Sequence, residues 1–273
     1  MKSPKQKLGI LAGAGKFPLY LSAVARDKGY QVVVIGPAGK LEPGIENFAD
    51  KVRTYRFARF AEFLQVIDEE KIQLALMAGK LDKRWLYQKD VELDELTLHL
   101  LKQLPDQKDD TIMHQILKTL EERGVEIMES VELIRDWLAP QGGFSRKQPD
   151  ENQQRDIAFG YKIAKEIGRL DIGQTVAVLN RAVLAVEAID GTDLTIIRAG
   201  QISPGAVVVK ILKPGQSLKF DVPVVGKSTI QSMIQAHAAV LAVEAGSCLV
   251  VEKEEMVALA DQNSISLFGI SHD

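Results

Sequence analysis

The sequence predicts an α/β protein with two domains, an N-terminal Rossmann-like domain built on a parallel sheet and a C-terminal mixed α/β domain. Short β-branched runs alternate with amphipathic helical patterns in the first half, as in parallel strands joined by helices. A segment rich in glycine, proline and polar residues follows at 139–149, and strand-like runs become more frequent after it. We therefore expect domains at 1–140 and 141–273.

The elements of the first domain follow from hydrophobic periodicity. Its strands are apolar, β-branched runs, and its helices carry apolar side chains three or four residues apart. Pro18 suits the first turn of a helix. In order, the expected elements are a strand at 8–12, a helix at 18–28, a strand at 31–35, a helix at 57–70, a strand at 73–78, a helix at 110–123 and an extended run at 125–128.

The second domain is expected to begin with a long helix and to continue as strands. Residues 151–170 have apolar side chains at helical spacing. Turn sequences that contain glycine at 190–192 and 213–216 separate later apolar runs. The expected strands lie at 175–179, 182–189, 206–212, 220–225 and 241–244.

The composition limits the classes of partner. A net charge of -3 and a pI of about 5.9 give no basic surface, so no nucleic-acid partner is expected. No run of about 18 apolar residues occurs, so we expect no membrane span. Cys248 is the single cysteine, which excludes an intrachain disulfide and fits a reducing cytoplasm. It lies in an apolar run and is expected to be a small buried side chain.

The loop between the first strand and the first helix is a candidate phosphate site. Glycines there let backbone N–H groups approach a phosphate, although a tight turn without a ligand has the same sequence. Pro18 replaces the third glycine of a dinucleotide fingerprint, and no acid ends the second strand, so NAD is not expected. Lys80, which follows Gly79 after the third strand, is either a second phosphate contact or a solvated side chain. The loop residues are Gly13, Ala14, Gly15, Lys16, Phe17 and Pro18.

Asp221 lies in an apolar run, where an ionised carboxylate has to be paired or metal-bound, or else be protonated. Pro223 cannot donate to a strand ladder, which places the run at the edge or mouth of a sheet. Two interpretations stay open. Asp221 is an active-site carboxylate presented at a strand end, or it closes a turn through its own backbone.

Polar residues of the second domain concentrate at its turns. Carboxylates interspersed with cations suit a phosphate bridged by a divalent metal, and solvated turns would have the same composition. The four histidines lack the spacing of a zinc site. The polar turn residues are Asp171, Gln174, Glu187, Asp190, Gly191, Thr192, Asp193, Arg198, Lys210, Lys213 and Asp221.

Taken in order, these turns resemble those of one family, the UDP-2,3-diacylglucosamine pyrophosphatases of the LpxI type from lipid A biosynthesis. The similar segments cover nearly the whole chain in the family's order. Ala14 departs from the family, in which an asparagine is expected. The segments are 12–18 and 77–80 in the first half, and 171–176, 186–193, 198–200, 213–216, 220–226 and 241–246 in the second.

The resemblance implies a Mg²⁺-dependent hydrolase that cleaves UDP-2,3-diacylglucosamine to UMP and 2,3-diacylglucosamine 1-phosphate, with water attacking the sugar-side phosphorus. Asp221 matches the family's essential aspartate and would hold Mg²⁺ or activate the water. Asp171 and Glu187 are the further metal ligands expected. Substrate contacts are expected from Gly13, Gly15, Lys16, Phe17, Pro18, Gly79 and Lys80, and from Gln174, Thr175, Gly191, Thr192, Arg198 and Lys213.

A cytoplasmic protein is implied as well, one that meets its glycolipid nucleotide substrate by peripheral contact with the inner-membrane leaflet. The sequence is compatible with a homodimer. The rival hypothesis is a nucleotide-sugar or lipid binding protein that does not cleave its ligand. Ligand binding without UMP release, whatever the divalent metal, would favour that rival.

Overall fold

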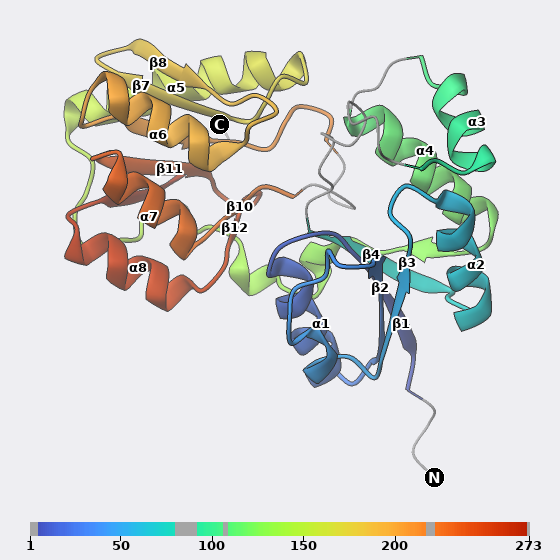
Figure 1. Cartoon of the computed structure of the whole chain (residues 1–273). Coiled ribbons are helices and arrows are strands. Elements are labelled where there is room, and N and C mark those ends of the chain that lie inside the picture. Colours follow the sequence, from blue (N-terminus) through green and yellow to red (C-terminus); the bar gives the residue numbers. More distant parts are fainter. Residues whose placement is uncertain (1–4, 80–91, 106–108, 217–221, 272–273) are drawn as a thin grey trace. The chain divides into compact units, whose positions relative to one another are not determined.

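The computed structural model describes residues 5–79, 92–105, 109–216 and 222–271. The chain forms two compact units with the boundary after Arg135 (Figure 1). Each unit is a sheet covered by helices, which confirms the predicted α/β class. No helix in the described ranges is long and apolar enough to cross a membrane.

The first unit holds a five-stranded parallel sheet in the order β3-β2-β1-β4-β5. Strand order reverses between β1 and β4, and ligands of open α/β sheets bind outside the carboxyl ends of such strands. Helices α2 and α4 share a core with β2, and α1 contacts β1, β2 and β4. The elements are β1 (Lys7–Ala12), α1 (Phe17–Asp27), β2 (Gln31–Pro37), β3 (Lys51–Tyr55), α2 (Phe60–Glu70), β4 (Leu74–Ala78), α3 (Glu95–Gln103), α4 (Asp109–Glu122) and β5 (Glu126–Ile127).

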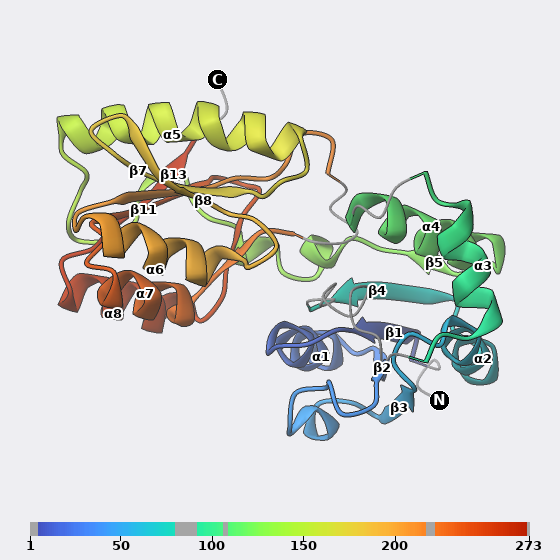
Figure 2. The same cartoon turned by 45° about the horizontal axis from the view of Figure 1, so that its top comes forward.

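The second unit holds a six-stranded sheet in the order β6-β13-β11-β9-β7-β8. Strands β13, β11 and β9 are parallel, whereas β6, β7 and β8 pair antiparallel with their neighbours. Helix α5 covers one face, and α6, α7 and α8 cover the other (Figure 2). The elements are β6 (Gly142–Gly143), α5 (Glu151–Arg169), β7 (Thr175–Leu179), β8 (Ala182–Val186), α6 (Thr192–Ile202), β9 (Val207–Lys210), β10 (Val224–Val225), α7 (Lys227–Gln235), β11 (Val240–Glu244), β12 (Leu249–Val250), α8 (Lys253–Gln262) and β13 (Ser266–Ile270).

A buried carboxylate fixes the hairpin between β7 and β8. Asn180 and Arg181 have φ values of 51° and 59°, as a two-residue hairpin turn requires. Asp156 of α5 accepts hydrogen bonds from both backbone N–H groups, at 2.8 and 2.7 Å. The helix on one face of the sheet therefore sets the register of this hairpin.

Several expected elements differ from the observed ones. The strand expected at 182–189 ends at Val186, because the chain turns at 188–191 into α6, whose threonines and isoleucines are typical of strands. Within the expected strand 220–225, only Val224–Val225 is a described strand, and it pairs with β12 in a separate two-stranded sheet. Part of the expected linker, Gly142–Gly143, forms edge strand β6. The sequence interpretation missed β3, β13 and helices α3, α6, α7 and α8.

Candidate active site

Two charged residues end neighbouring parallel strands of the second unit. Lys210 is the last residue of β9, and Glu244 is the last residue of β11. Thr175, the first residue of β7, pairs with Lys210. All three side chains are buried. Because this is the edge at which ligands of α/β sheets bind, buried charge here marks the candidate site.

A chain of hydrogen bonds joins Lys210 to Glu187. Lys210 Nζ donates to Thr192 Oγ1 at 2.7 Å, and Thr192 Oγ1 donates to Glu187 Oε1 at 2.8 Å. The Gln174 backbone N–H donates to Glu187 Oε2 at 3.2 Å. The three side chains of this Lys210–Thr192–Glu187 chain are 6, 9 and 8% exposed, so water screens their charges little. Of the predicted site residues, Gln174, Thr175, Glu187 and Thr192 come together here.

Gly173 permits this arrangement. A Cβ atom at Gly173 would lie 2.3 Å from the Glu187 carbonyl oxygen and 2.9 Å from its Cβ. Only glycine allows the Gly173–Gln174 backbone to approach Glu187 so closely. The Gly-Gln-Thr sequence at 173–175 is thus explained by packing against Glu187.

The environment of Glu187 keeps its carboxyl ionised. Burial by itself would raise the pKa of this group. The charge of Lys210 lowers it, as do hydrogen bonds from Thr175, Thr192 and the Gln174 backbone, and the net pKa of Glu187 lies below its ordinary value. Glu187 and Lys210 therefore form a buried pair of opposite charge.

The other predicted cations of this unit also have carboxylate partners. Lys213 Nζ lies 2.7 Å from Asp171 Oδ1, and both side chains are largely buried. Arg198 lies 3.2 Å from Asp190 and donates to the Val186 carbonyl at 2.9 Å. Each predicted cation thus already has a counter-charge.

Of the predicted metal ligands, Asp171 contacts Lys213 directly and Glu187 is linked to Lys210 through Thr192. Among the residues that the structure describes, no group of three or more His, Cys, Asp or Glu side chains could hold a metal ion. Two carboxylates neutralised by lysines do not fit a Mg²⁺ site by themselves, because the cation would compete with Lys213 and Lys210. Asp221, the third predicted ligand, lies outside the described residues.

In the first unit, the loop after β1 lies against the end of β4. The Gly13 N–H donates to the Ala78 carbonyl at 2.7 Å. Gly79 has φ of 90°, and a Cβ there would lie 2.8 Å from Gly13 C and 2.9 Å from Pro18 Cγ. The predicted residues Gly13, Pro18 and Gly79 therefore meet at the point where strand order reverses. Gly15 and Lys16 are exposed, and Phe17 begins α1.

Lys80, the residue after Gly79, was predicted as a phosphate contact and lies outside the described residues.

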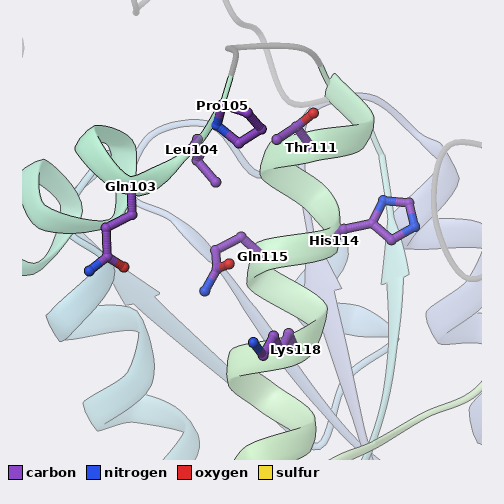
Figure 3. A pocket seen from close by; sticks show the side chains of 7 residues that line it. All are labelled: Gln103, Leu104, Pro105, Thr111, His114, Gln115 and Lys118. Carbon is purple, nitrogen blue, oxygen red and sulfur yellow. The ribbon is translucent and has the colours of Figure 1, made fainter.

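The same unit has an open hollow of about 420 Å³ between α3 and α4, with His114 and Lys118 on its wall (Figure 3). It contains none of the predicted site residues.

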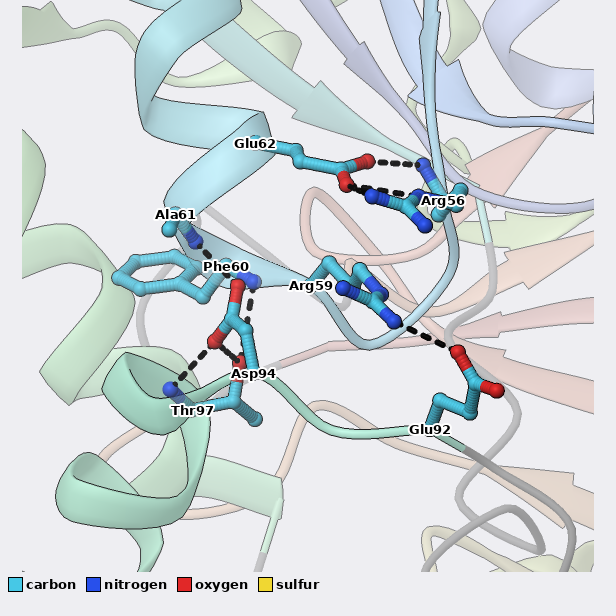
Figure 4. A network of polar contacts seen from close by, with 8 residues as sticks. All are labelled: Arg56, Arg59, Phe60, Ala61, Glu62, Glu92, Asp94 and Thr97. Atoms are coloured by element: carbon cyan, nitrogen blue, oxygen red, sulfur yellow. Dashed lines mark hydrogen bonds and ion pairs between the residues drawn. The ribbon is translucent and has the colours of Figure 1, made fainter.

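Asp94, which the sequence interpretation did not select, organises the N-terminal ends of α2 and α3. It accepts from the Thr97 N–H at 2.7 Å and the Ala61 N–H at 2.9 Å, so one carboxylate caps the first turns of both α3 and α2 (Figure 4). Burial would raise the pKa of Asp94, but these hydrogen bonds lower it overall. The sequence signal is an aspartate three residues before a threonine at a helix start.

The second unit also contains a polar group that the sequence interpretation did not select. Glu244 is bound by Lys165 at 2.6 Å and by the Tyr161 hydroxyl at 3.2 Å, both from α5. Burial raises the pKa of Tyr161 to about 12, and the neighbouring Glu244 charge adds to that effect. The sequence signal for this buried group is a glutamate, Glu244, at the end of an apolar strand.

The fold and the site define a two-domain α/β protein, with a Rossmann-type strand order in one domain and buried lysine–carboxylate pairs at the strand ends of the other. The chain belongs to the LpxI family, since residues 7–137 match the LpxI N-terminal domain and residues 140–268 match the LpxI C-terminal domain. It is similar to the UDP-2,3-diacylglucosamine pyrophosphatase LpxI of Caulobacter vibrioides. The identity is 28% over 280 residues, which cover 97% of this chain and 98% of that protein.

Proposed function

We propose that this protein hydrolyses the diphosphate of UDP-2,3-diacylglucosamine in lipid A biosynthesis, releasing UMP and 2,3-diacylglucosamine 1-phosphate. The observation that carries this proposal is the match to a pyrophosphatase of that name over 97% of the chain, in both domains. The substrate is accordingly a glycolipid nucleotide.

The proposed reaction is attack by water on the sugar-side phosphorus. The new bond joins the water oxygen to this phosphorus, and the bond from the same phosphorus to the bridging oxygen breaks, so UMP leaves with the bridging oxygen. Asp221 would take the proton from water or hold Mg²⁺. Phosphoryl transfer depends mainly on position and charge neutralisation, so the reaction needs an aligned water and a positive charge near the phosphates and no covalent intermediate.

The second domain would bind the polar part of the substrate. Within the described residues, Gln174 Oε1 is buried without a hydrogen-bond partner, which makes it an acceptor for a hydroxyl or N–H group. Thr192, behind Gly191, begins α6, and a helix N-terminus favours phosphate. Thr175 and Thr192 would keep Glu187 in place beside them, since both hydroxyls are hydrogen-bonded to it. Arg198 and Lys213 would orient their partner loops, because their charges are already compensated.

The first domain would bind another part of the nucleotide sugar. Gly15 and Lys16 would offer backbone N–H groups, and Phe17 with Pro18 would begin the helix behind them, while Gly13, whose N–H donates to the Ala78 carbonyl, would hold the loop against β4. Gly79 shapes this loop by packing against it, and Lys80 would add a charge.

Mg²⁺ is the proposed cofactor and Asp221 is the residue that would hold it, whereas Asp171 and Glu187 would join it only on release from Lys213 and Lys210. It would supply the positive charge that the paired lysines do not provide. Cytoplasmic location, peripheral contact with the inner leaflet and a homodimer remain predictions.

The test uses the purified full chain, UDP-2,3-diacylglucosamine in mixed micelles, Mg²⁺ and ¹⁸O-labelled water. We expect UMP release, with label only in the sugar phosphate. Asp221→Ala should lose at least about 100-fold in kcat. Asp68→Ala, which removes an exposed carboxylate of α2, is the control and should keep wild-type turnover. Binding without UMP release, or a fully active Asp221→Ala, would refute the proposal.

A further inference from the structure

We propose that Glu244 and Lys165 are positioning residues for the reaction, because they hold the backbone of Leu212, at the start of the segment that carries Asp221. The inference rests on the proposed function. Neither residue is a predicted contact of substrate or metal. Their contacts are to the chain itself, on the C-terminal side of β9.

Both backbone polar groups of Leu212 are bound by this pair. The Leu212 N–H donates to Glu244 Oε2 at 2.7 Å, and Lys165 Nζ donates to the Leu212 carbonyl at 2.9 Å. Lys165 Nζ also donates to Glu244 Oε1 at 2.6 Å. Leu212 lies two residues beyond the end of β9, where the sheet no longer binds the backbone. Side chains from α5 and β11 therefore replace the ladder at this point.

The other end of the segment is held by the turn that Glu244 begins. The Cys248 N–H donates to the Glu244 carbonyl at 3.0 Å, and the Leu249 N–H donates to the Pro223 carbonyl at 2.8 Å. Pro223 lies two residues after Asp221. Residues 244–249 thus bind the backbone at Leu212 and again at Pro223.

Glu244 is buried, so its contacts with Lys165 and Leu212 are made in the protein interior. The side chain is 1% exposed and that of Lys165 is 22% exposed. A buried carboxylate costs stability unless it is paired and fully hydrogen-bonded, and a hydrophobic residue would fill the same space more favourably. One oxygen of Glu244 accepts from the Leu212 N–H and the other from Lys165, which binds the Leu212 carbonyl, so the two side chains together fix the backbone at Leu212.

Substitution should therefore lower kcat more than it raises KM. In Glu244→Gln, the amide accepts from Leu212 with one end and turns N–H groups toward Lys165 with the other, so the Lys165 contact is lost. We expect kcat to fall about 10- to 100-fold, since a displacement of about 1 Å costs that much, with KM within about threefold. Lys165→Met should behave likewise, and Lys165→Arg should recover part of kcat.

Glu70→Gln is the matched control. Glu70 is a buried carboxylate bound by Lys51 and Arg53 in the first unit, so its loss lowers stability to a similar extent without touching Leu212. We expect Glu70→Gln to keep wild-type kcat at a temperature where it is folded. Turnover is measured on UDP-2,3-diacylglucosamine, with Asp221→Ala alongside.

The outcomes separate the two proposals. If the wild type releases no UMP, or Asp221→Ala is fully active, the proposed function fails. If Asp221→Ala is inactive while Glu244→Gln and Lys165→Met keep kcat within twofold, the positioning role is overturned. An equal loss of kcat in Glu70→Gln overturns it too. If Glu244→Gln does not fold, the comparison of Lys165→Met with Lys165→Arg decides.

Discussion

Replacing Lys210 by Met should destabilise the second domain in a manner that depends on pH. The change removes an ammonium that is 6% exposed and keeps most of the apolar stem. Glu187 then remains buried without its compensating charge, and the hydrogen bond to Thr192 is lost. Breaking one partner of a buried pair costs about 3–5 kcal/mol, whereas an exposed pair is worth about 0–1 kcal/mol. At about 3 °C per kcal/mol, the thermal midpoint should fall by about 10–15 °C at neutral pH.

The sign of the pH dependence follows from Glu187. In the wild type its pKa is lowered from 4.5, so its stabilising contribution is present above pH 4.5 and is lost as pH falls through the folded-state pKa. In Lys210→Met the lowering charge is absent, so the pKa of Glu187 is higher than in the wild type. Ionised Glu187 then stabilises the fold less than in the wild type, and this deficit grows as pH rises through the pKa of the group. The difference in midpoint between wild type and variant should be largest near pH 7.5, smaller at pH 4, and should shrink further as pH falls through the folded-state pKa of Glu187.

The assay is thermal unfolding by circular dichroism at both pH values. Lys227→Met, which removes a half-exposed lysine 3.9 Å from Glu255, is the control and should change the midpoint little. Adding Glu187→Gln to Lys210→Met should recover part of the loss, because no uncompensated charge remains. An equal loss at pH 4 and pH 7.5, or no loss at all, would refute this account of the pair.

Three further outcomes follow from close contacts in the same unit. Gly173→Ala should lower the thermal midpoint and UMP release together, because its Cβ would lie 2.3 Å from the Glu187 carbonyl oxygen; unchanged values for both would contradict this. Asp156→Ala should cost about 2–4 kcal/mol, since it leaves the Asn180 and Arg181 N–H groups without their acceptor, and urea unfolding would show it. Cys248 is fully buried and burial raises its pKa to about 12, so a thiol reagent at pH 8 should react only after denaturation. Rapid labelling of folded protein would contradict that burial.

The first domain was predictable where strands are apolar and fully buried. The apolar runs that became β1, β2 and β4 are each followed by a glycine, which marks where the strand was expected to end. The β1–α1 loop and Gly79 lie together because β1 and β4 are neighbours in the sheet. Strand β3 was missed because Lys51, Arg53 and Thr54 interrupt its pattern at the sheet edge, where charged side chains face solvent or pair with Glu70. Periodicity reports burial, so it is weakest at edges.

In the second domain the turn residues were found, but their pairing was not. Sequence order places Asp171 far from Lys213, and Glu187 far from Lys210, and only the antiparallel placement of β7 between β8 and β9 brings each pair together. The strand expected at 182–189 ran too far for a related reason. Ile189 looks like a strand residue, yet it is exposed in the turn before α6. Tertiary pairing, which a single sequence does not encode locally, decided both points.

The paired lysines bear on magnesium dependence. Three lysines near the carboxyl ends of β9 and β11 each have a carboxylate partner, so they bring hydrogen bonds to a diphosphate and little net positive charge. The proposed reaction nevertheless develops negative charge on phosphate oxygens, which needs a counter-charge in a site that excludes water. Chelation with EDTA should therefore abolish UMP release while the protein stays folded, and Mg²⁺ should restore it. Turnover that persists without metal would mean that one pair opens to free its lysine. The pairs are Lys210 with Glu187, Lys213 with Asp171 and Lys165 with Glu244.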